Sequence, residues 1–496
     1  MSGAQGPPAR LWRVAYRLLL WSVFPGLWVR LWWRGRTVPQ TRQLWRQRLG
    51  WCPRPPAAHG IWVHAVSAGE ANTAALLVRE LLRRDAAAVI TLTTMTPTGR
   101  ERGMALLGDS VHHVYAAYDY PGAVARFLDR VEPRQAVFIE TELWPNTLAA
   151  CRARGVGTLL ANARLSAGSA RGYARLGNFG TWLLAQLDVV ACQFEAHAER
   201  FRQLGVPPAR LHVTGSLKFD FVAPPDLAAA AARLRTQWGI GNRPIWVAGS
   251  THPGEERIVL DAHRRVLAQL PDCLLLLAPR HPQRAPQVDL AGPPLRVALR
   301  AGGVPPVDSQ VVICDRMGEL LLWYALAQVA FVGGSLIDRG GHNPIEPAAL
   351  GLPVLMGRSA FNFVEVAAAF AAAGALQWIG SGQAGAVAGD TALGNAGSGN
   401  LASGDVASGD VASGNSAWGN SASGKAAASL AAAVVALLTD PAGRQRHGAA
   451  GQAVIASHRG ATGRLADIVG RWPAPGLPSV TSLNCLRRTD GRWAAS

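Results

Sequence analysis

The chain has 496 residues, of which 49% are hydrophobic and 16% charged, with a formal net charge of +17. This composition can bury sizeable cores and excludes a wholly disordered protein. No unbroken apolar run approaches the pattern of a polytopic membrane protein, so that class is excluded as well. At about 150 residues per domain, and with three non-globular stretches set aside, we predict two domains.

The positive charge is concentrated at the start of the chain. Residues 1–69 hold ten arginines and no aspartate or glutamate. Positive charge gathered at one end favours an anionic membrane surface over nucleic acid as the partner. A general bias toward arginine is the alternative account, because the whole chain contains only two lysines.

The first 36 residues are predicted to be a membrane anchor. Residues 11–33 read LWRVAYRLLLWSVFPGLWVRLWW, and the longest piece without charge, 18–29, is shorter than the roughly 20 residues that a span needs. We therefore expect either a single tilted span or a helix that lies in the interface, with arginines on anionic headgroups. A hairpin packed on the protein's own core is the alternative.

Residues 37–222 are predicted to form an α/β domain. Continuous apolar runs alternate with windows of helical length and period, and runs without polar alternation are typical of strands covered on both faces. The predicted strands are 61–66, 88–95, 135–140, 157–163, 188–193 and 211–216. This alternation favours a doubly wound parallel sheet.

After a break at 223–226 the same rhythm returns, which predicts a second domain over 227–472. Its expected strands are 244–250, 273–279, 310–315, 329–335 and 353–357. Residues 381–425 are rich in glycine, alanine, serine and asparagine and are expected to be a flexible insertion, and 473–496 a polar tail. Two such domains facing each other would bind ligands at the carboxyl ends of their strands.

Three charged residues follow predicted strands of the first domain. Glu70 lies at the first strand-to-helix turn, Glu140 follows the third strand with Glu142 two residues later, and Lys218 follows the last strand. Two carboxylates at a strand end face water or a site, because burial of both without partners is costly. The alternative for Glu70 is an ordinary helix cap.

Polar motifs also follow strands of the second domain. Arg280 offers a fork suited to phosphate. Residues 317–319 open a predicted helix whose free N–H groups could hold an anion. Glu346 follows Asn343 and Pro344 at another helix start, where a carboxylate can accept hydrogen bonds from ribose hydroxyls. Ordinary capping is the alternative for each of these motifs.

Several catalytic signatures are absent from the sequence. It contains no P-loop, no G-x-G-x-x-G after the first strand, no G-x-S-x-G elbow and no H-E-x-x-H. The histidines are scattered without ligand spacing, and the six cysteines form no C-x-x-C pair, which fits a reduced compartment. We predict neither a metal site nor a cofactor.

Read together, the motifs resemble the Kdo (3-deoxy-D-manno-octulosonic acid) transferase family of lipopolysaccharide biosynthesis. The resemblance covers about residues 11–375, with its motifs in one order. They are HAVSAGE (64–70), TTMTPTG (93–99), YDYPGAVARFLD (118–129), ETELWPN (140–146), ANARLSAGSARGYARL (161–176), VTGSLKFD (213–220), APRHP (278–282), MGEL (317–320) and FVGGSLIDRGGHNPIEPAALGLPVLMG (331–357).

This resemblance implies a membrane-associated glycosyltransferase of the GT-B fold that has two facing Rossmann-like domains and works without a metal. The implied donor is CMP-Kdo, the implied acceptor a lipid A precursor, and the implied location the cytoplasmic side of the inner membrane. By the same resemblance, Glu70 is the proton acceptor, and Glu140 and Lys218 stabilise charge. The CMP site implied in this way comprises Pro279, Arg280, Met317, Gly318, Glu319, Asn343, Pro344, Ile345 and Glu346. A membrane-attached sensor of sugar nucleotides without turnover and a nucleotide-sugar epimerase are the alternative functions.

Overall fold

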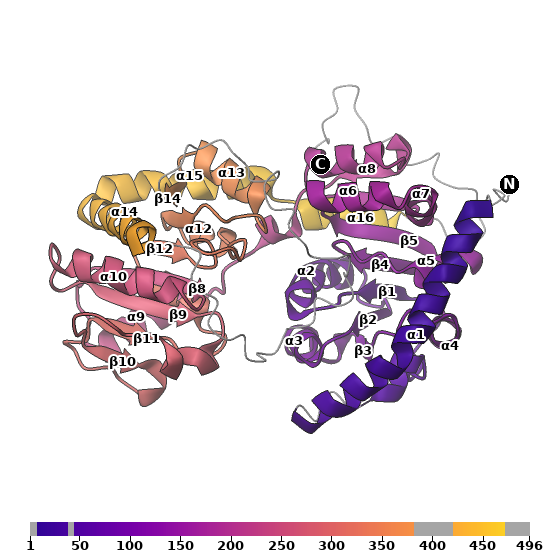
Figure 1. Ribbon diagram of the computed structural model, residues 1–496, viewed down its shortest axis with the longest axis horizontal. Helices are drawn as coiled ribbons and strands as arrows, with labels where there is room; N and C mark the ends of the chain where they lie inside the picture. The colour runs from indigo at the N-terminus through magenta and orange to yellow at the C-terminus, as the bar shows by residue number, and fades with distance from the viewer. Residues whose placement is uncertain (1–6, 38–43, 381–419, 472–496) are drawn as a thin grey trace. The chain divides into compact units, whose positions relative to one another are not determined.

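The computed structural model of the chain describes residues 7–37, 44–380 and 420–471 (Figure 1). These residues form two compact units, and each is described by itself. The first unit contains the described residues up to 220 together with 459–471, and the second contains those between 221 and 458.

The described residues of the first unit contain a sheet of seven parallel strands in the order β3-β2-β1-β4-β5-β6-β7. The strands are β1 Ile61–His64, β2 Ile90–Thr94, β3 His112–Tyr115, β4 Gln135–Ile139, β5 Gly157–Ala163, β6 Val189–Cys192 and β7 Leu211–Val213. Every residue of β1, β2 and β4 is buried, as expected for strands covered on both faces. The order of the strands reverses between β1 and β4, and in open α/β sheets ligands bind at such a switch point.

Helices alternate with these strands. They are α2 Ala68–Arg84, α3 Pro97–Leu107, α4 Pro121–Val131, α5 Pro145–Ala153, α6 Ala167–Arg175, α7 Asn178–Leu184 and α8 Glu195–Gln203, with short 3₁₀ turns η2 Trp45–Leu49, η3 Gly108–Ser110, η4 Pro208–Arg210 and η5 Leu217–Asp220. Three of these helices begin with proline, which has no N–H to satisfy and a backbone angle that already suits a helix. The predicted doubly wound α/β architecture is confirmed.

Helix α16 (Ala461–Gly470) belongs to the first unit. Its Leu465 and Val469 are buried in a core cluster with residues of α2, β1 and β2. The carboxylate of Asp220 accepts hydrogen bonds from the N–H groups of Gly460 (2.6 Å) and Thr462 (2.5 Å) at the start of α16. The structure thus differs from the expected second domain of 227–472, since the last helix of that range completes the first unit.

The described residues of the second unit form another sheet of seven parallel strands, in the order β10-β11-β9-β8-β12-β13-β14. The strands are β8 Ile245–Thr251, β9 Leu274–Pro279, β10 Val297–Leu299, β11 Val311–Ile313, β12 Val329–Val332, β13 Val354–Gly357 and β14 Leu376–Ile379. The helices are α9 Leu227–Gln237, α10 Glu255–Leu267, α11 Leu320–Leu326, α12 Ile345–Ala349, α13 Val364–Ala372, α14 Asn420–Thr439 and α15 Pro441–His458, with 3₁₀ turns η6 Pro282–Gln287 and η7 Arg300–Gly302. Here the switch point lies between β8 and β12.

The predicted insertion at 381–425 lies mostly outside the described residues, as does the predicted tail at 473–496. Description resumes at residue 420, where α14 begins, so the last six residues of the predicted insertion are helical. Among the described residues, one helical stretch, Ala422–Thr439 of α14, is long and apolar enough to cross a membrane. Leu430, Val434 and Leu437 of this stretch are buried in a core cluster of the second unit with residues of α10 and β8.

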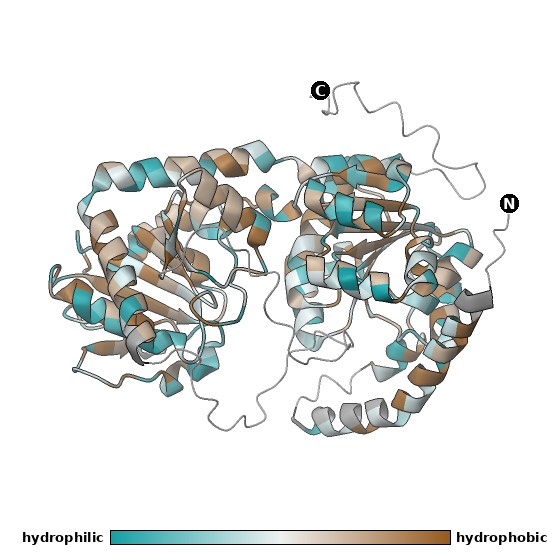
Figure 2. Cartoon of the chain, turned by 45° about the horizontal axis from the view of Figure 1, so that its top comes forward, coloured by the Kyte–Doolittle hydropathy of each residue, from teal (hydrophilic) through white to brown (hydrophobic). Residues whose placement is uncertain are grey.

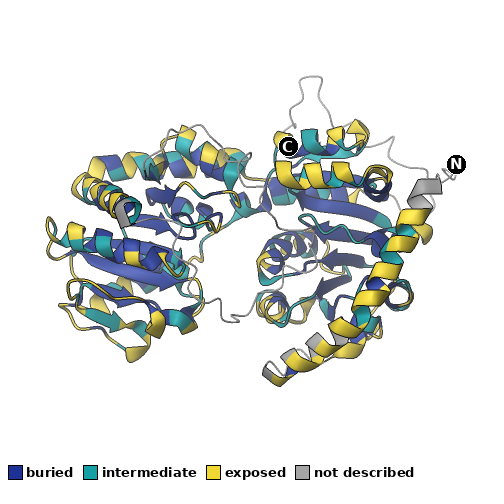
Figure 3. Ribbon diagram, viewed as in Figure 1, coloured by how far each residue is buried: buried dark blue, intermediate teal, exposed yellow. Residues whose placement is uncertain are grey.

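The N-terminal segment is a helix, α1 (Pro7–Thr37), that includes Pro25 and is not among the helices apolar enough to span a membrane. The spanning anchor is therefore not shown, and α1 packs on the first unit as a helix rather than as a hairpin. The Tyr16 hydroxyl donates to the buried carboxylate of Asp119 (2.9 Å), and Leu20 is buried against Tyr120. Much of the remaining helix is exposed, as Figure 3 shows, and Figure 2 shows hydrophobic residues interspersed along it.

Candidate active site

Glu70 lies in the first turn of α2, directly after the loop that follows β1. Its carboxylate accepts hydrogen bonds from the Val66 N–H (2.7 Å) and the Ser67 hydroxyl (3.0 Å), while Ser67 caps the helix. This is close to a capping box, except that the carboxylate accepts from the residue before the cap rather than from the N–H of Ser67, and it agrees with the cap alternative. However, Glu70 is only 8% exposed, and burial raises its pKa to about 7. A cap with such a pKa can also exchange a proton near neutral pH.

Glu140 and Lys218 form an ion pair close to Glu70. The Lys218 Nζ lies 3.1 Å from the Glu140 Oε1, and both side chains are a little over one quarter exposed. Glu140 follows β4 with a φ of 64°, a left-handed conformation that non-glycine residues rarely adopt and that is common at functional sites. Lys218 lies in η5, where the N–H of Leu217 donates to the Asn162 side chain (3.0 Å).

A third carboxylate, Glu142, joins this group. Its pKa is raised to about 8, first by burial and then by the charge of Glu70. The Trp144 indole N–H donates to it at 2.9 Å. The charge of Glu140 likewise raises the pKa of Glu70, whereas the charge of Lys218 lowers it. The three residues predicted for this site, Glu70, Glu140 and Lys218, are therefore electrostatically coupled within one unit.

A small apolar pocket of about 10 Å³ in the first unit, which was not predicted from the sequence, is connected to this group through Trp144, the residue that binds Glu142. It is lined by Trp62, His64, Met95, Ala116, Ala117, Val124, Phe127, Phe138, Trp144 and Thr147. The buried Nε2 of His64 has no hydrogen-bond partner, and burial lowers the pKa of this imidazole to about 4. The pocket thus offers apolar contacts and one neutral nitrogen beside the indole that binds Glu142.

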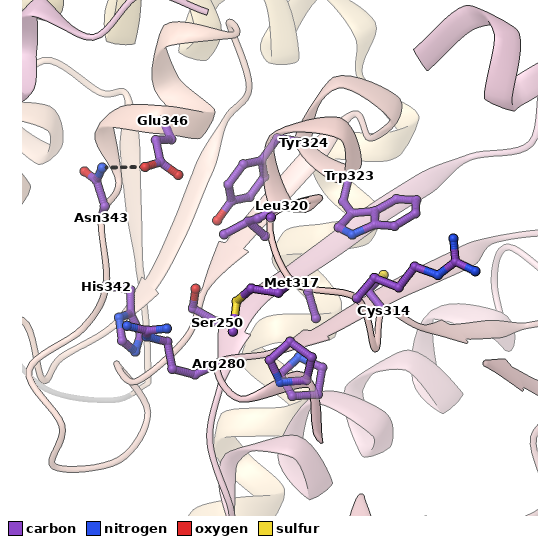
Figure 4. Close-up of a pocket in the computed structure, with 15 residues that line it drawn as sticks. Ser250, Arg280, Cys314, Met317, Leu320, Trp323, Tyr324, His342, Asn343 and Glu346 are labelled. Atoms are coloured by element: carbon purple, nitrogen blue, oxygen red, sulfur yellow. Dashed lines mark hydrogen bonds between the residues drawn. The ribbon is translucent and has the colours of Figure 1, made fainter. Parts of the chain in front are cut away.

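The second unit contains a cavity of about 230 Å³ at the carboxyl ends of β8, β9 and β11 (Figure 4). It is lined by Ser250, Ala278, Pro279, Arg280, Pro282, Cys314, Arg316, Met317, Gly318, Leu320, Trp323, Tyr324, His342, Asn343 and Glu346. Arg280 and Arg316 are exposed, so their guanidinium groups are available to an anion. The Asn343 amide donates to the Glu346 carboxylate at 3.1 Å and orients it, as Figure 4 shows.

Six of the nine residues predicted for a nucleotide site line this cavity, and three do not. Glu319 is paired with Arg300 at 3.4 Å, and Pro344 and Ile345 are buried behind Asn343. The helix expected to open at 317–319 is α11, which begins at Leu320 and has seven residues.

Other lining residues were missed because they carry no motif of their own. Ser250 has a φ of 58° at a β-bulge near the end of β8, and the bulge is set by the pairing of β8 with β9. Gly249 leaves room for the cavity residue Tyr324, since a Cβ there would lie 2.4 Å from the tyrosine hydroxyl. His342 precedes Asn343 and could have been noted for its place after a strand.

Within the described ranges, no group of three histidine, cysteine, aspartate or glutamate side chains is arranged to hold a metal ion. The five cysteines found there are buried and not in disulfides.

Two parallel sheets, one with a buried carboxylate near neutrality and the other with an arginine-lined cavity, define a class of enzyme with two Rossmann-like units. Solved structures agree with this fold. An S. aureus MnaA–UDP complex is similar with a TM-score of 0.51, 11% identity and coverage of 83% of this chain and 96% of that one. At that identity the likeness concerns the fold alone.

Sequence comparison is more specific. A family model described as 3-deoxy-D-manno-octulosonic-acid transferase (kdotransferase) matches residues 43–221. A 3-deoxy-D-manno-octulosonic acid transferase of Haemophilus influenzae is 40% identical over 364 residues, covering 72% of this chain and 84% of the relative. One of Bordetella pertussis is 39% identical over 383 residues, covering 73% and 87%. The chain therefore belongs to the Kdo transferase family.

One solved structure of a relative covers part of the chain. The C-terminal CMP-Kdo binding domain of WaaA from Acinetobacter baumannii is 28% identical and covers 46% of this chain and 97% of its own, with a TM-score of 0.35.

Proposed function

We propose that this chain transfers Kdo from CMP-Kdo to a hydroxyl of a lipid A precursor with inversion, in lipopolysaccharide core biosynthesis. The observation that carries the proposal is that Glu70, Glu140 and Lys218 come together at the carboxyl ends of the strands of the first sheet. The family supports the donor, since a relative's domain is described as binding CMP-Kdo.

Glu70 acts as the general base in this proposal. An attacking hydroxyl must lose its proton as the bond to the anomeric carbon forms, and a base with a pKa near the working pH serves best. With a pKa of about 7, Glu70 is ionised in half of the molecules at neutral pH and can still accept a proton. The Val66 and Ser67 bonds orient it, and a carboxylate has lone pairs beyond these two.

Lys218 and Glu140 stabilise charge near the reacting sugar. An ammonium close to Glu70 favours the ionised base, and Glu140 holds that ammonium in place. Because the donor carries a carboxylate and a phosphate, a compact cation beside the base also suits an anionic sugar.

The cavity of the second unit would bind the CMP portion of the donor. Arg280 would bind the phosphate and stabilise the charge that develops as CMP departs, in place of a metal ion. The Glu346 carboxylate, oriented by Asn343, would accept hydrogen bonds from ribose hydroxyls.

The test is to incubate the full chain with CMP-Kdo and a lipid A precursor and to measure the mass of the lipid. Addition of a Kdo unit supports the proposal. Saturable CMP binding without a product would favour the sensor instead, and conversion of a nucleotide sugar without any acceptor would favour the epimerase.

We further propose that α1 attaches the protein to the cytoplasmic face of the inner membrane. Exposed apolar residues on a helix mark an interaction surface. Those on α1 are Leu11, Trp12, Val14, Leu18, Leu19, Trp21, Val23, Val29, Trp32 and Trp33. Segments rich in arginine and tryptophan are typical of helices that lie in the interface of anionic membranes.

This attachment predicts that replacing apolar side chains of α1 weakens the binding of the protein to vesicles. A Leu18→Gln, Leu19→Gln variant should bind phosphatidylglycerol vesicles at least about tenfold more weakly, since each buried leucine contributes about 1.5–3 kcal/mol. The control is Ala15→Gln, an equally exposed position of α1. Cosedimentation measures binding, and equal partitioning of both variants would contradict the attachment.

A further inference from the structure

Two histidines meet at the switch point of the second sheet, and no step of the proposed function uses them. His252 follows β8 directly, and His342 lies in the loop after β12, the neighbouring strand. His342 lines the cavity, with Arg280 close to it in Figure 4. The pair therefore lies where open α/β sheets bind their ligands.

The two rings are held together by a direct hydrogen bond. Their Nε2 atoms are 2.8 Å apart and their planes differ by 8°. One ring must therefore donate and the other accept, so the pair holds one proton between its Nε2 atoms. The fold makes room for this contact, since a Cβ at Gly334 would lie 3.2 Å from the His342 Nε2.

The charges around the pair are mostly positive. Burial, with smaller contributions from neighbouring cations, lowers the pKa of His252 to about 4 and that of His342 to about 3. The cations that act on the pair are Arg280, His281, Arg284 and Arg339. Without an anion in the cavity, the pair is therefore neutral at physiological pH.

The carboxylates on the elements packed around the pair are bound to other groups. Glu255 accepts from the N–H groups of Gly334, Ser335 and Leu336 at 2.7–3.1 Å. Glu256 is paired with Arg284 at 3.3 Å, and Glu346 accepts from Asn343. No carboxylate of the described residues is among the main causes of either pKa shift, so a negative charge that favours protonation of the pair must come from the ligand.

We propose that the His252–His342 pair takes up one proton from solvent when the phosphate of a nucleoside monophosphate occupies the cavity. The proton goes to the Nδ1 of the donating ring, because both Nε2 atoms are already engaged. The result is an imidazolium that stays bonded to its neighbour and faces the phosphate beside Arg280. This deepens the proposed function and rests on it, since it names how the donor site matches the charge of the departing CMP.

The size of the effect follows from the charges. An opposite charge within about 4–6 Å raises the pKa of a group by about 1–3 units, which would bring a pKa of about 4 to about 6.5. At that value, CMP binding at pH 6.5 takes up about half a proton, and the affinity rises about fourfold between pH 7.5 and pH 6.0.

The experiment is isothermal titration of the full chain with CMP at several pH values, in two buffers that differ in ionisation enthalpy. Wild-type protein should take up about half a proton more at pH 6.5 than either His252→Gln or His342→Gln. The phosphate of CMP titrates near pH 6, but that contribution is the same for all variants. Cytidine, which lacks the phosphate, should give no difference, and His447→Gln on α15 is the matched control.

The outcomes separate the two proposals. If CMP binds wild type and both variants with the same proton uptake and the same pH slope, the pair is structural and this inference is overturned while the donor site stands. If the variants lose affinity equally at every pH, the inference is likewise overturned. Failure of wild type to bind CMP at any pH would overturn both proposals.

Discussion

At the scale of single residues, the proposed base Glu70 also takes part in capping α2. The capping bonds fix its orientation, while burial and the neighbouring Glu140 raise its pKa to about 7. Burial is the larger cause, and it cannot be read from a motif, because it depends on which side chains cover the turn.

The raised pKa of Glu70 predicts the pH dependence of transfer. A general base is active when it is deprotonated. The kcat at saturating donor should therefore increase as the pH rises through about 7 and decrease at lower pH. A pH series with CMP-Kdo and a lipid A precursor measures this. A kcat that is independent of pH between 5.5 and 8 would contradict the assignment of Glu70 as base.

Replacing Lys218 should change the pH at which kcat rises. Its ammonium lowers the pKa of Glu70, so Lys218→Met should shift the rise in kcat to higher pH and reduce the rate on the order of 10²-fold. Lys218→Arg keeps the charge and serves as the control. If kcat of Lys218→Met rises at the same pH as that of wild type, Lys218 and Glu70 are not coupled in the working enzyme.

The residue types at the sites could be predicted from the sequence, but their backbone conformations could not. Glu140, Asn162 and Ser250 all have positive φ, and two of them lie at β-bulges set by pairing with a neighbouring strand. Local propensity favours glycine at such positions. Tertiary contacts impose these conformations, so no local sequence pattern predicts them.

At the scale of elements, the central strands were predictable and the sheet edges were less so. Eleven predicted runs correspond to strands, because apolar residues dominate most of them without regular polar alternation. The missed strands β3, β10 and β14 are all edge strands, with partly exposed or polar residues. An edge strand buries less apolar surface, so its pattern resembles that of a loop.

The position of α16 could not be predicted either. Its apolar face would suit either sheet, and the first unit holds it through contacts with residues nearly 400 positions away, such as the 2.6 Å ion pair of Asp467 with Arg84. Sequence order alone assigns a last helix to the last domain. Packing against residues distant in sequence places α16 in the first unit instead.

This packing predicts that α16 stabilises the first unit. Leu465 is completely buried, and Leu465→Ala should lower the free energy of unfolding by about 2–5 kcal/mol. Chemical denaturation measures the loss, with Arg471→Ala at an exposed position as the control. An unchanged midpoint for Leu465→Ala would show that α16 is dispensable for the unit.

At the scale of the whole molecule, the proposed chemistry and the proposed donor binding belong to different units. The first holds the coupled carboxylates and lysine, and the second holds the arginine-lined cavity. The division predicts that chemistry and donor binding can be lost separately, because each depends on residues of one unit.

The most direct measurement of this claim is the turnover of Glu70→Gln beside its affinity for CMP. Loss of the base should lower kcat by about 10²–10⁴-fold, while the dissociation constant for CMP stays within about twofold of wild type. Turnover equal to that of wild type, or a comparable loss of CMP binding, would contradict the account.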